Sequence, residues 1–155
     1  MNEIARTATT LVDRPGAAAA TRDVVDAFLF RLGIGDFEGA SRLFAGDFEW
    51  HLSWPADQLG GPVPWIRERR TAGDVASHFA TIAQHNTSLH PGTSVDTIVV
   101  DGIDAVILGT IRNTLRRSGR AYEARFALHL TVEHGLIQRY SIHEDSLAVA
   151  LAWFG

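Results

Sequence analysis

The fold is decided by residues 94–145, which read SVDTIVVDGIDAVILGTIRNTLRRSGRAYEARFALHLTVEHGLIQRYSIHED. Four segments of this stretch are rich in apolar residues that alternate with polar ones, a pattern typical of β-strands. They are residues 94–100, 104–115, 121–133 and 136–145. A glycine preceded by a polar residue lies in each gap, at Asp101-Gly102, Ser118-Gly119 and His134-Gly135. Such pairs favour tight hairpin turns, so the stretch predicts four consecutive antiparallel strands.

The chain on either side of these strands shows mostly helical patterns. Apolar residues recur at helical spacing after Thr21, and an alternating pattern over residues 48–54 ends at Pro55. The elements expected are a helix from Thr21 to Gly33, a short helix capped by Asp36 and stopped by Gly46, a strand over 48–54, a long loop over 55–72, a helix from Asp74 to Asn86 and a last helix from Ser146 to Trp153 with Asp145 as its N-cap.

This order of elements predicts an α+β fold. We expect a cone-shaped α+β barrel, in which a curved, mostly antiparallel sheet is wrapped around the three helices of the N-terminal half. The helices leave the wide end of such a barrel unfilled, which predicts a central pocket. Residues 1–20 are expected to form a flexible N-terminal arm, because Pro15-Gly16 and an alanine run precede the first helix. Residues 21–155 are then the single domain.

The composition limits the classes of function. The chain has 155 residues, no cysteine and a net charge of −4, which exclude disulfides and thiolate chemistry and argue against nucleic-acid binding. No apolar run is long enough for a signal peptide or a membrane span, so we expect no membrane partner and a cytoplasmic location. Four tryptophans and eight phenylalanines either fill the core or line a cavity for an apolar ligand.

Motifs for metals and cofactors do not occur. The seven histidines include no H-x-H or H-E-x-x-H pattern, and the glycines of residues 33–39 follow a predicted helix instead of a strand. We therefore expect no metal and no cofactor.

Several short stretches together resemble a known family. They are Gly35-Asp36-Phe37-Glu38-Gly39-Ala40, Leu43-Phe44-Ala45-Gly46-Asp47 with Trp50, Val132-Glu133-His134-Gly135-Leu136-Ile137 and Glu144-Asp145-Ser146-Leu147-Ala148. Over about residues 22–154 the chain resembles the SnoaL-like/ketosteroid-isomerase branch of the nuclear-transport-factor-2-like superfamily. The resemblance implies the cone-shaped fold and a homodimer formed through the outer face of the sheet. It does not imply one reaction, because isomerases, polyketide cyclases, epoxide hydrolases, dehydratases and non-catalytic binders share this fold.

The positions that carry catalysis in these relatives are apolar here. The resemblance places the general base of the steroid isomerases at Leu52, their tyrosine donor at Phe28 and their protonated aspartate at Leu128. The aspartate of the epoxide hydrolases and cyclases falls at Ile142. The simplest transfer of any of these reactions to this chain therefore fails.

Alternation along the strands, together with the resemblance, predicts which residues line the pocket. They are Phe28, Trp50, Leu52, Trp54, Phe79, Arg112, Phe126, Leu128 and Ile142. Arg112 belongs to this set because we expect Val106, Leu108 and Thr110 to face inward on the same strand. The alternative for Arg112 is an ion pair with Glu123 across the hairpin.

Three polar residues among these apolar positions are the candidate catalytic groups. His78 is expected to carry protons at cellular pH, Tyr140 to donate a hydrogen bond to a developing oxyanion, and Glu144 to act as an acid or base with a raised pKa. The alternatives are a core histidine bonded to a backbone carbonyl, a tyrosine used for packing and an exposed carboxylate.

These observations support two hypotheses from different classes. The first is a small cofactor-free enzyme that cyclises, isomerises or dehydrates a lipophilic, polyketide- or terpenoid-like substrate by acid/base chemistry. The second is a non-catalytic module of the same fold that binds a hydrophobic ligand or mediates dimerisation.

Overall fold

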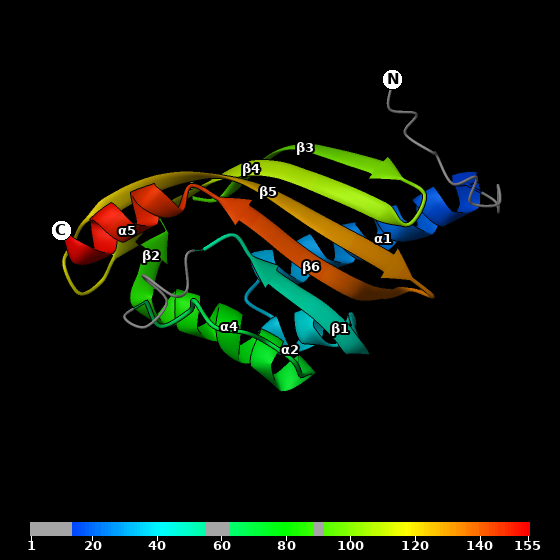
Figure 1. Cartoon of the computed structure of the whole chain (residues 1–155), viewed down its shortest axis with the longest axis horizontal. Coiled ribbons are helices and arrows are strands. Elements are labelled where there is room, and N and C mark those ends of the chain that lie inside the picture. Colours follow the sequence, from blue (N-terminus) through cyan, green and yellow to red (C-terminus); the bar gives the residue numbers. More distant parts are fainter. Residues whose placement is uncertain (1–13, 55–62, 89–91) are drawn as a thin grey trace, which may run out of the picture.

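The computed structural model describes residues 14–54, 63–88 and 92–155. Its elements in chain order are α1 Arg14–Gly33, α2 Phe37–Ser41, β1 Phe44–Leu52, α4 Ala72–His85, β2 Asn86–Ser88, β3 Ser94–Asp101, β4 Asp104–Leu115, β5 Ala121–Glu133, β6 Leu136–Glu144 and α5 Ser146–Phe154. The strands form one sheet in the order β1-β6-β5-β4-β2, and β3 also pairs with β4 (Figure 1). None of the helices in the described ranges is long and apolar enough to cross a membrane.

The four predicted strands are confirmed almost to the residue. β4 and β5 have the predicted bounds, β3 extends one residue further to Asp101, and β6 ends one residue earlier at Glu144. All three of their pairings are antiparallel. The remaining edge differs, because β1 pairs with β6 in parallel and makes the sheet mixed.

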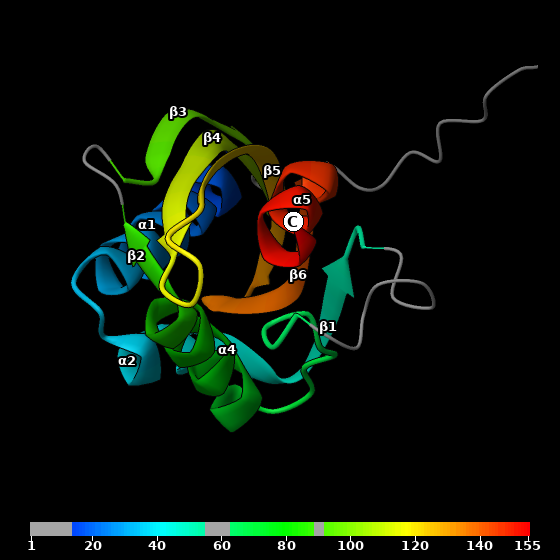
Figure 2. The same ribbon diagram turned by 90° about the vertical axis from the view of Figure 1, so that its left-hand side faces the viewer.

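The helices lie on one side of this sheet. α1 packs against β3, β4 and β5, while α4 contacts α2 and β1. Figure 2 shows that the sheet curves around these helices. α5 lies near the end of the sheet where β5 begins and β6 ends. The predicted α+β arrangement of a curved sheet wrapped around N-terminal helices is therefore confirmed.

The start of the first helix is predicted wrongly. α1 begins at Arg14, so the alanine run is helical, and Pro15 lies in the first turn, where proline costs no helical hydrogen bond. Thr21 is buried inside this helix, and its hydroxyl donates a hydrogen bond to the carbonyl of Gly102 at 2.8 Å. The rest of the expected arm, residues 1–13, lies outside the described residues.

The first strand also begins earlier than residue 48. The short helix ends at Ser41, and β1 starts at Phe44 because Phe44 pairs with Ile137 of β6. The register between the two strands then shifts before Glu49, so the alternation becomes regular only from about residue 48. The short helix was expected to end at Gly46, but β1 already begins at Phe44. The cause is pairing with a distant strand, which local sequence patterns do not show.

The even-numbered residues of β4 were predicted to face inward, and this prediction is wrong by one residue. The residues that pair with the inward-facing side of β5 are the odd-numbered ones, such as Ile107 opposite Leu128 and Gly109 opposite Phe126. Arg112 therefore lies on the outer face, where its Nε donates a hydrogen bond to Glu123 Oε2 at 2.9 Å. The cross-hairpin ion pair is the interpretation that the structure supports, and Arg112 is removed from the pocket lining.

Gly109 offers a test of this register. A Cβ at this position would collide with the backbone carbonyl of Ser94 and lie 2.7 Å from the ring of Phe126. We expect Gly109→Ala to lower the free energy of unfolding by about 2 kcal/mol, because overpacking against backbone is relieved only by moving a strand.

The measurement is chemical denaturation, with Gly46→Ala in β1 as the control, since a Cβ at Gly46 meets no atom within 4 Å. Equal stability of the two variants would contradict the close approach of β3, β4 and Phe126.

Candidate functional site

The inner face of the sheet holds two apolar clusters. The first contains Phe28, Phe44 and Tyr140 and joins α1, α4 and the sheet. The second contains Trp54, Trp65, Tyr122 and other residues from around α5. Of the three candidate catalytic residues, His78 lies on α4, and Tyr140 and Glu144 lie on the inner face of β6.

Tyr140 is fixed by the pairing of β1 with β6. Trp50 and Tyr140 are register partners on these strands, and their rings stack in parallel with centroids 4.0 Å apart. Phe28 and Phe79 contact the edge of the Tyr140 ring. The Tyr140 side chain is buried, and its hydroxyl makes no hydrogen bond to the part of the chain that the structure describes. Burial raises the pKa of this hydroxyl, so it is a neutral hydrogen-bond donor.

His78 is a neutral imidazole in an aromatic wall. It is 4 % exposed, and its ring lies edge-on to those of Trp50 and Phe79, both at 4.9 Å. Its Nδ1 lies 3.1 Å from the carbonyl oxygen of Trp65, which can only accept, so Nδ1 carries the proton and Nε2 is an acceptor. Burial, and then the positive charge of Arg69, lower the pKa of His78 to about 3. This hydrogen bond agrees with the alternative of a core histidine bonded to a backbone carbonyl.

Glu144 lies at the inward-facing end of β6, opposite Phe126 of β5. Burial, and to a smaller extent the charge of Asp145, raise its pKa to about 7. The charge of Glu144 in turn adds to the effect of burial in raising the pKa of both Tyr140 and Tyr122. Glu144 lies four residues after Tyr140 in β6, so the two side chains are on the same face of the strand. Its neighbour Asp145 is the N-cap of α5, as predicted, and accepts a hydrogen bond from the amide of Ala148.

Sequence reasoning missed a buried polar network around Tyr122. The Tyr122 hydroxyl donates to Asn86 Oδ1 at 3.2 Å and accepts from Asn113 Nδ2 at 3.3 Å. Asn86 Nδ2 donates to the carbonyl of Ile82 at the end of α4, so the network ties this helix to the sheet. Extending the β5 alternation from Phe126 back to Tyr122 would have found the tyrosine. Asn113 was hidden by the wrong register of β4.

The expected apolar lining divides between the two clusters. Phe28, Phe79, Phe126, Leu128 and Ile142 pack in or against the first cluster. Leu52 and Trp54 belong to the second. Only Trp50 and Phe79 of the expected lining make ring contacts with both His78 and Tyr140.

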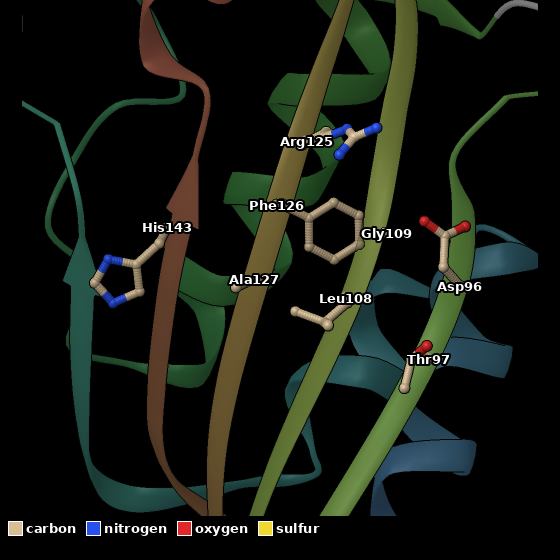
Figure 3. A pocket seen from close by; sticks show the side chains of 8 residues that line it. All are labelled: Asp96, Thr97, Leu108, Gly109, Arg125, Phe126, Ala127 and His143. Atoms are coloured by element: carbon tan, nitrogen blue, oxygen red, sulfur yellow. The ribbon is translucent and has the colours of Figure 1, made fainter.

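Two surface hollows lie away from these residues. The larger, about 470 Å³, is on the outer face of the sheet. In Figure 3 its lining comes from the neighbouring strands β3 to β6, with the helices behind them. The smaller, about 240 Å³, lies between α1 and the β5–β6 turn. Neither hollow is lined by His78, Tyr140 or Glu144, so the volume of the expected central pocket stays a prediction, as does the homodimer.

Metal binding receives no support from the described ranges, where no three or more His, Asp or Glu side chains are grouped as ligands. The polar groups on the inner face can instead donate, accept and transfer protons. Tyr140 supplies a neutral donor, His78 an acceptor, and Glu144 a carboxyl group whose pKa of about 7 allows both protonation states.

Comparison with known proteins identifies the fold. The model of the SnoaL-like domain family matches residues 21–140. No curated protein matches the chain. Among solved structures, an NTF2-like protein from Burkholderia thailandensis is 20 % identical with a TM-score of 0.72, covering 85 % of this chain and 95 % of that one.

Two further structures are similar over most of their length. A proposed isomerase from Rhodopseudomonas palustris is 15 % identical with a TM-score of 0.68, covering 88 % of this chain and 96 % of that one. TerC, co-crystallised with polyporic acid, is 16 % identical with a TM-score of 0.70, covering 88 % and 99 %. At these identities the likeness shows a shared NTF2-like, ketosteroid-isomerase-like fold.

Proposed function

The chain belongs to the SnoaL-like domain family, and from that premise we propose that it is a small cofactor-free enzyme in which Glu144 transfers protons within a lipophilic substrate. The substrate is polyketide- or terpenoid-like, and the reaction is an isomerisation, a cyclisation or a dehydration. Glu144 is the proton carrier, Tyr140 the hydrogen-bond donor, and the aromatic residues around Trp50 bind the apolar body of the substrate.

The observation that carries this proposal is the place of Glu144 on the inner face of the sheet, where most side chains are apolar. Its pKa of about 7 leaves a substantial fraction of both the carboxylate and the carboxylic acid at neutral pH. A proton carrier works best when its pKa lies near the operating pH, because both protonation states are then available. The Tyr140 hydroxyl on the same face of β6 is neutral and has no partner among the described residues, so it is free to bind a substrate oxygen.

The chemistry follows from these two groups. The Glu144 carboxylate removes a proton from a carbon next to a substrate carbonyl, and the Tyr140 hydroxyl donates a hydrogen bond to the enolate oxygen that forms. The resulting carboxylic acid then returns the proton. Delivery to another carbon of the conjugated system completes an isomerisation, and delivery to a departing hydroxyl releases water. If the enolate carbon instead attacks a second carbonyl of the same molecule, the proton goes to the new alkoxide and a ring is closed.

His78 has a supporting role in this proposal. Its pKa of about 3 keeps the imidazole neutral, and its proton is engaged by the carbonyl of Trp65. A group with such a low pKa is a weak base at neutral pH, so we assign proton transfer to Glu144 instead of His78. The imidazole holds the ring of Trp50 in place. Because it is neutral, it adds no positive charge to the apolar wall.

The structural neighbours support an organic ligand on this fold. TerC was crystallised with polyporic acid, and the Rhodopseudomonas palustris protein is a proposed isomerase. An apolar pocket with few polar groups is the usual form of a small-molecule site.

The test is the Glu144→Gln variant. A substrate is first captured on the native protein from a cell extract and identified by native mass spectrometry. We expect the variant to lower kcat/KM by at least about 100-fold, the usual contribution of a general acid or base. The native kcat/KM should rise with pH through about 7, because proton abstraction needs the carboxylate.

The matched control is Glu123→Gln, which removes a carboxylate from the outer face, where it pairs with Arg112. Retention of full activity by Glu144→Gln, or an equal loss in both variants, would contradict the role of Glu144.

A second function, that of a non-catalytic binding module, is favoured by one observation. Phe28, Leu52 and Leu128 stand where the resemblance places the acidic and tyrosine groups of the isomerases, and Phe28 and Leu128 are buried in the core. In this case the captured ligand is recovered unchanged from both the native protein and the Glu144→Gln variant.

A further inference from the structure

Three buried N–H groups have no hydrogen-bond partner within residues 14–54, 63–88 and 92–155. They are the indole Nε1 of Trp50, the indole Nε1 of Trp54 and the guanidinium Nε of Arg69. A buried donor without an acceptor costs free energy, so native structures rarely leave one unpaired without a reason such as a bound ligand. Trp54 as a whole is 8 % exposed, so its indole N–H is well shielded from bulk water.

The two indole donors belong to side chains that pack with His78 or share an apolar cluster with Trp65. The ring of Trp50 packs on the ring of His78 at 4.9 Å. Trp54 and Trp65 belong to the same apolar cluster. After burial, the charge of Arg69 is the next contribution that lowers the pKa of His78.

Arg69 differs from the two arginines beside it in the segment between Val63 and α4. The Nη1 of Arg67 donates to the carbonyls of Val63 and Ile66 at 2.9 and 2.6 Å. Arg70 donates to Glu68 at 2.9 Å, and both side chains are about four-fifths exposed. Arg69 is partly buried and makes no hydrogen bond or ion pair within the described residues.

The nearest acidic group does not satisfy Arg69. The Asp74 carboxylate accepts hydrogen bonds from the backbone amides of Arg70 and Thr71, at 3.0 and 2.9 Å, and completes the capping box of α4. Desolvation lowers the pKa of Arg69 more than the charge of Asp74 raises it, so this cation is only incompletely compensated.

We propose that Arg69, with the indole N–H groups of Trp50 and Trp54, forms a subsite for an anionic oxygen of the substrate. Guanidinium and indole groups have only donors, so the atom that they bind must be an acceptor. Arginine prefers a carboxylate or another oxyanion, and a bound anion would offset the desolvation of its charge. The inference rests on the proposed function and narrows its substrate to an organic acid with a flat apolar body.

This subsite also orients the substrate. The anionic oxygen binds at Arg69, while the carbon that gains or loses a proton lies toward Glu144 and Tyr140. The separation keeps the negative charge of the substrate away from the carboxylate of Glu144, which would otherwise repel it.

The experiment compares two probes that differ in charge but hardly in shape, 2-naphthoate and 2-naphthamide. Their dissociation constants are measured by titration calorimetry at a pH where the carboxylic acid is ionised. We expect the native protein to bind the naphthoate at least about tenfold more tightly than the amide, as a charge-assisted hydrogen bond provides. Arg69→Gln should abolish this preference without changing the affinity for the amide.

The matched control is Arg70→Gln, which removes an exposed arginine one residue away and should keep the preference. Binding of naphthamide by Arg69→Gln reports that the variant is folded, and Arg69→Lys should keep part of the preference because it keeps the charge. Equal affinities of the native protein for the two probes, or an unchanged preference in Arg69→Gln, would overturn the anion subsite while leaving the apolar site intact. If neither probe binds, the apolar site of the proposed function fails, and the subsite fails with it.

Discussion

At about pH 8 the Glu144→Gln variant is expected to be more stable than the native protein by about 3 kcal/mol, and near pH 4 the two should be equally stable. The carboxyl group ionises at 4.5 in an ordinary environment and at about 7 in the folded protein. Each pKa difference of one corresponds to about 1.4 kcal/mol, which gives the expected size. Glutamine has nearly the same shape and does not ionise, so it avoids this cost.

The sign follows from proton binding. Between pH 4.5 and about 7 the unfolded chain has lost the Glu144 proton, while the folded protein still holds it. Stability therefore falls as the pH rises through this window, and the contribution is fully present only below 4.5. The same burial that makes Glu144 suitable for proton transfer makes it unfavourable for stability at neutral pH, a trade-off that is common at active sites.

The measurement is denaturation by urea at several pH values for the native protein, Glu144→Gln and the control Glu123→Gln. Glu123 is 60 % exposed on the outer face, so its variant should follow the native curve within a few tenths of a kcal/mol. Parallel curves for all three proteins would show that Glu144 is not desolvated, and would remove the main support for its role as proton carrier.

The strands were predictable because local patterns and tertiary structure agree there. In β5, Phe126, Leu128 and Leu130 alternate with polar or small residues. A turn with a glycine lies before this strand and another lies after it. β4 shows where this reasoning fails. Val106 and Leu108 on its outer face are as apolar as Ala105 and Ile107 on its inner face, so the period of two fixes the strand without fixing its register.

The candidate site was predictable only in part. Alternation along β6 placed Tyr140 and Glu144 on the inner face correctly. The electrostatic character of His78 was not predictable, because besides burial it depends on the charge of Arg69 and on the carbonyl of Trp65. Both come from the segment before α4, which shows no helical or strand period. Its position is determined by tertiary packing of Trp65 and Ile66 in the second cluster.

Acidification is expected to act on His78 in the opposite direction. Its pKa falls from an ordinary 6.5 to about 3 on folding, so below 6.5 the unfolded chain gains a proton that the folded protein cannot bind. Stability from this group is present above 6.5 and is lost as the pH falls, by about 4 kcal/mol near the folded pKa. His78→Asn should remove this slope. The Asn amide can still donate to the carbonyl of Trp65, and its smaller side chain lowers stability equally at every pH.

The two buried groups should therefore conceal each other in the native protein. From pH 7 down to 4.5 the gain from protonating Glu144 and the loss from His78 are each about 3 kcal/mol, so the native curve should be nearly flat. Each variant should reveal the other group: Glu144→Gln should lose stability over this range, and His78→Asn should gain it. His134→Asn is the control, since His134 is exposed in the β5–β6 turn and its positive φ suits asparagine. If the native protein and both variants all show flat curves, neither group is buried as the structure places it. If the two variants have opposite slopes, the folded interior contains a neutral imidazole and a protonated carboxyl group.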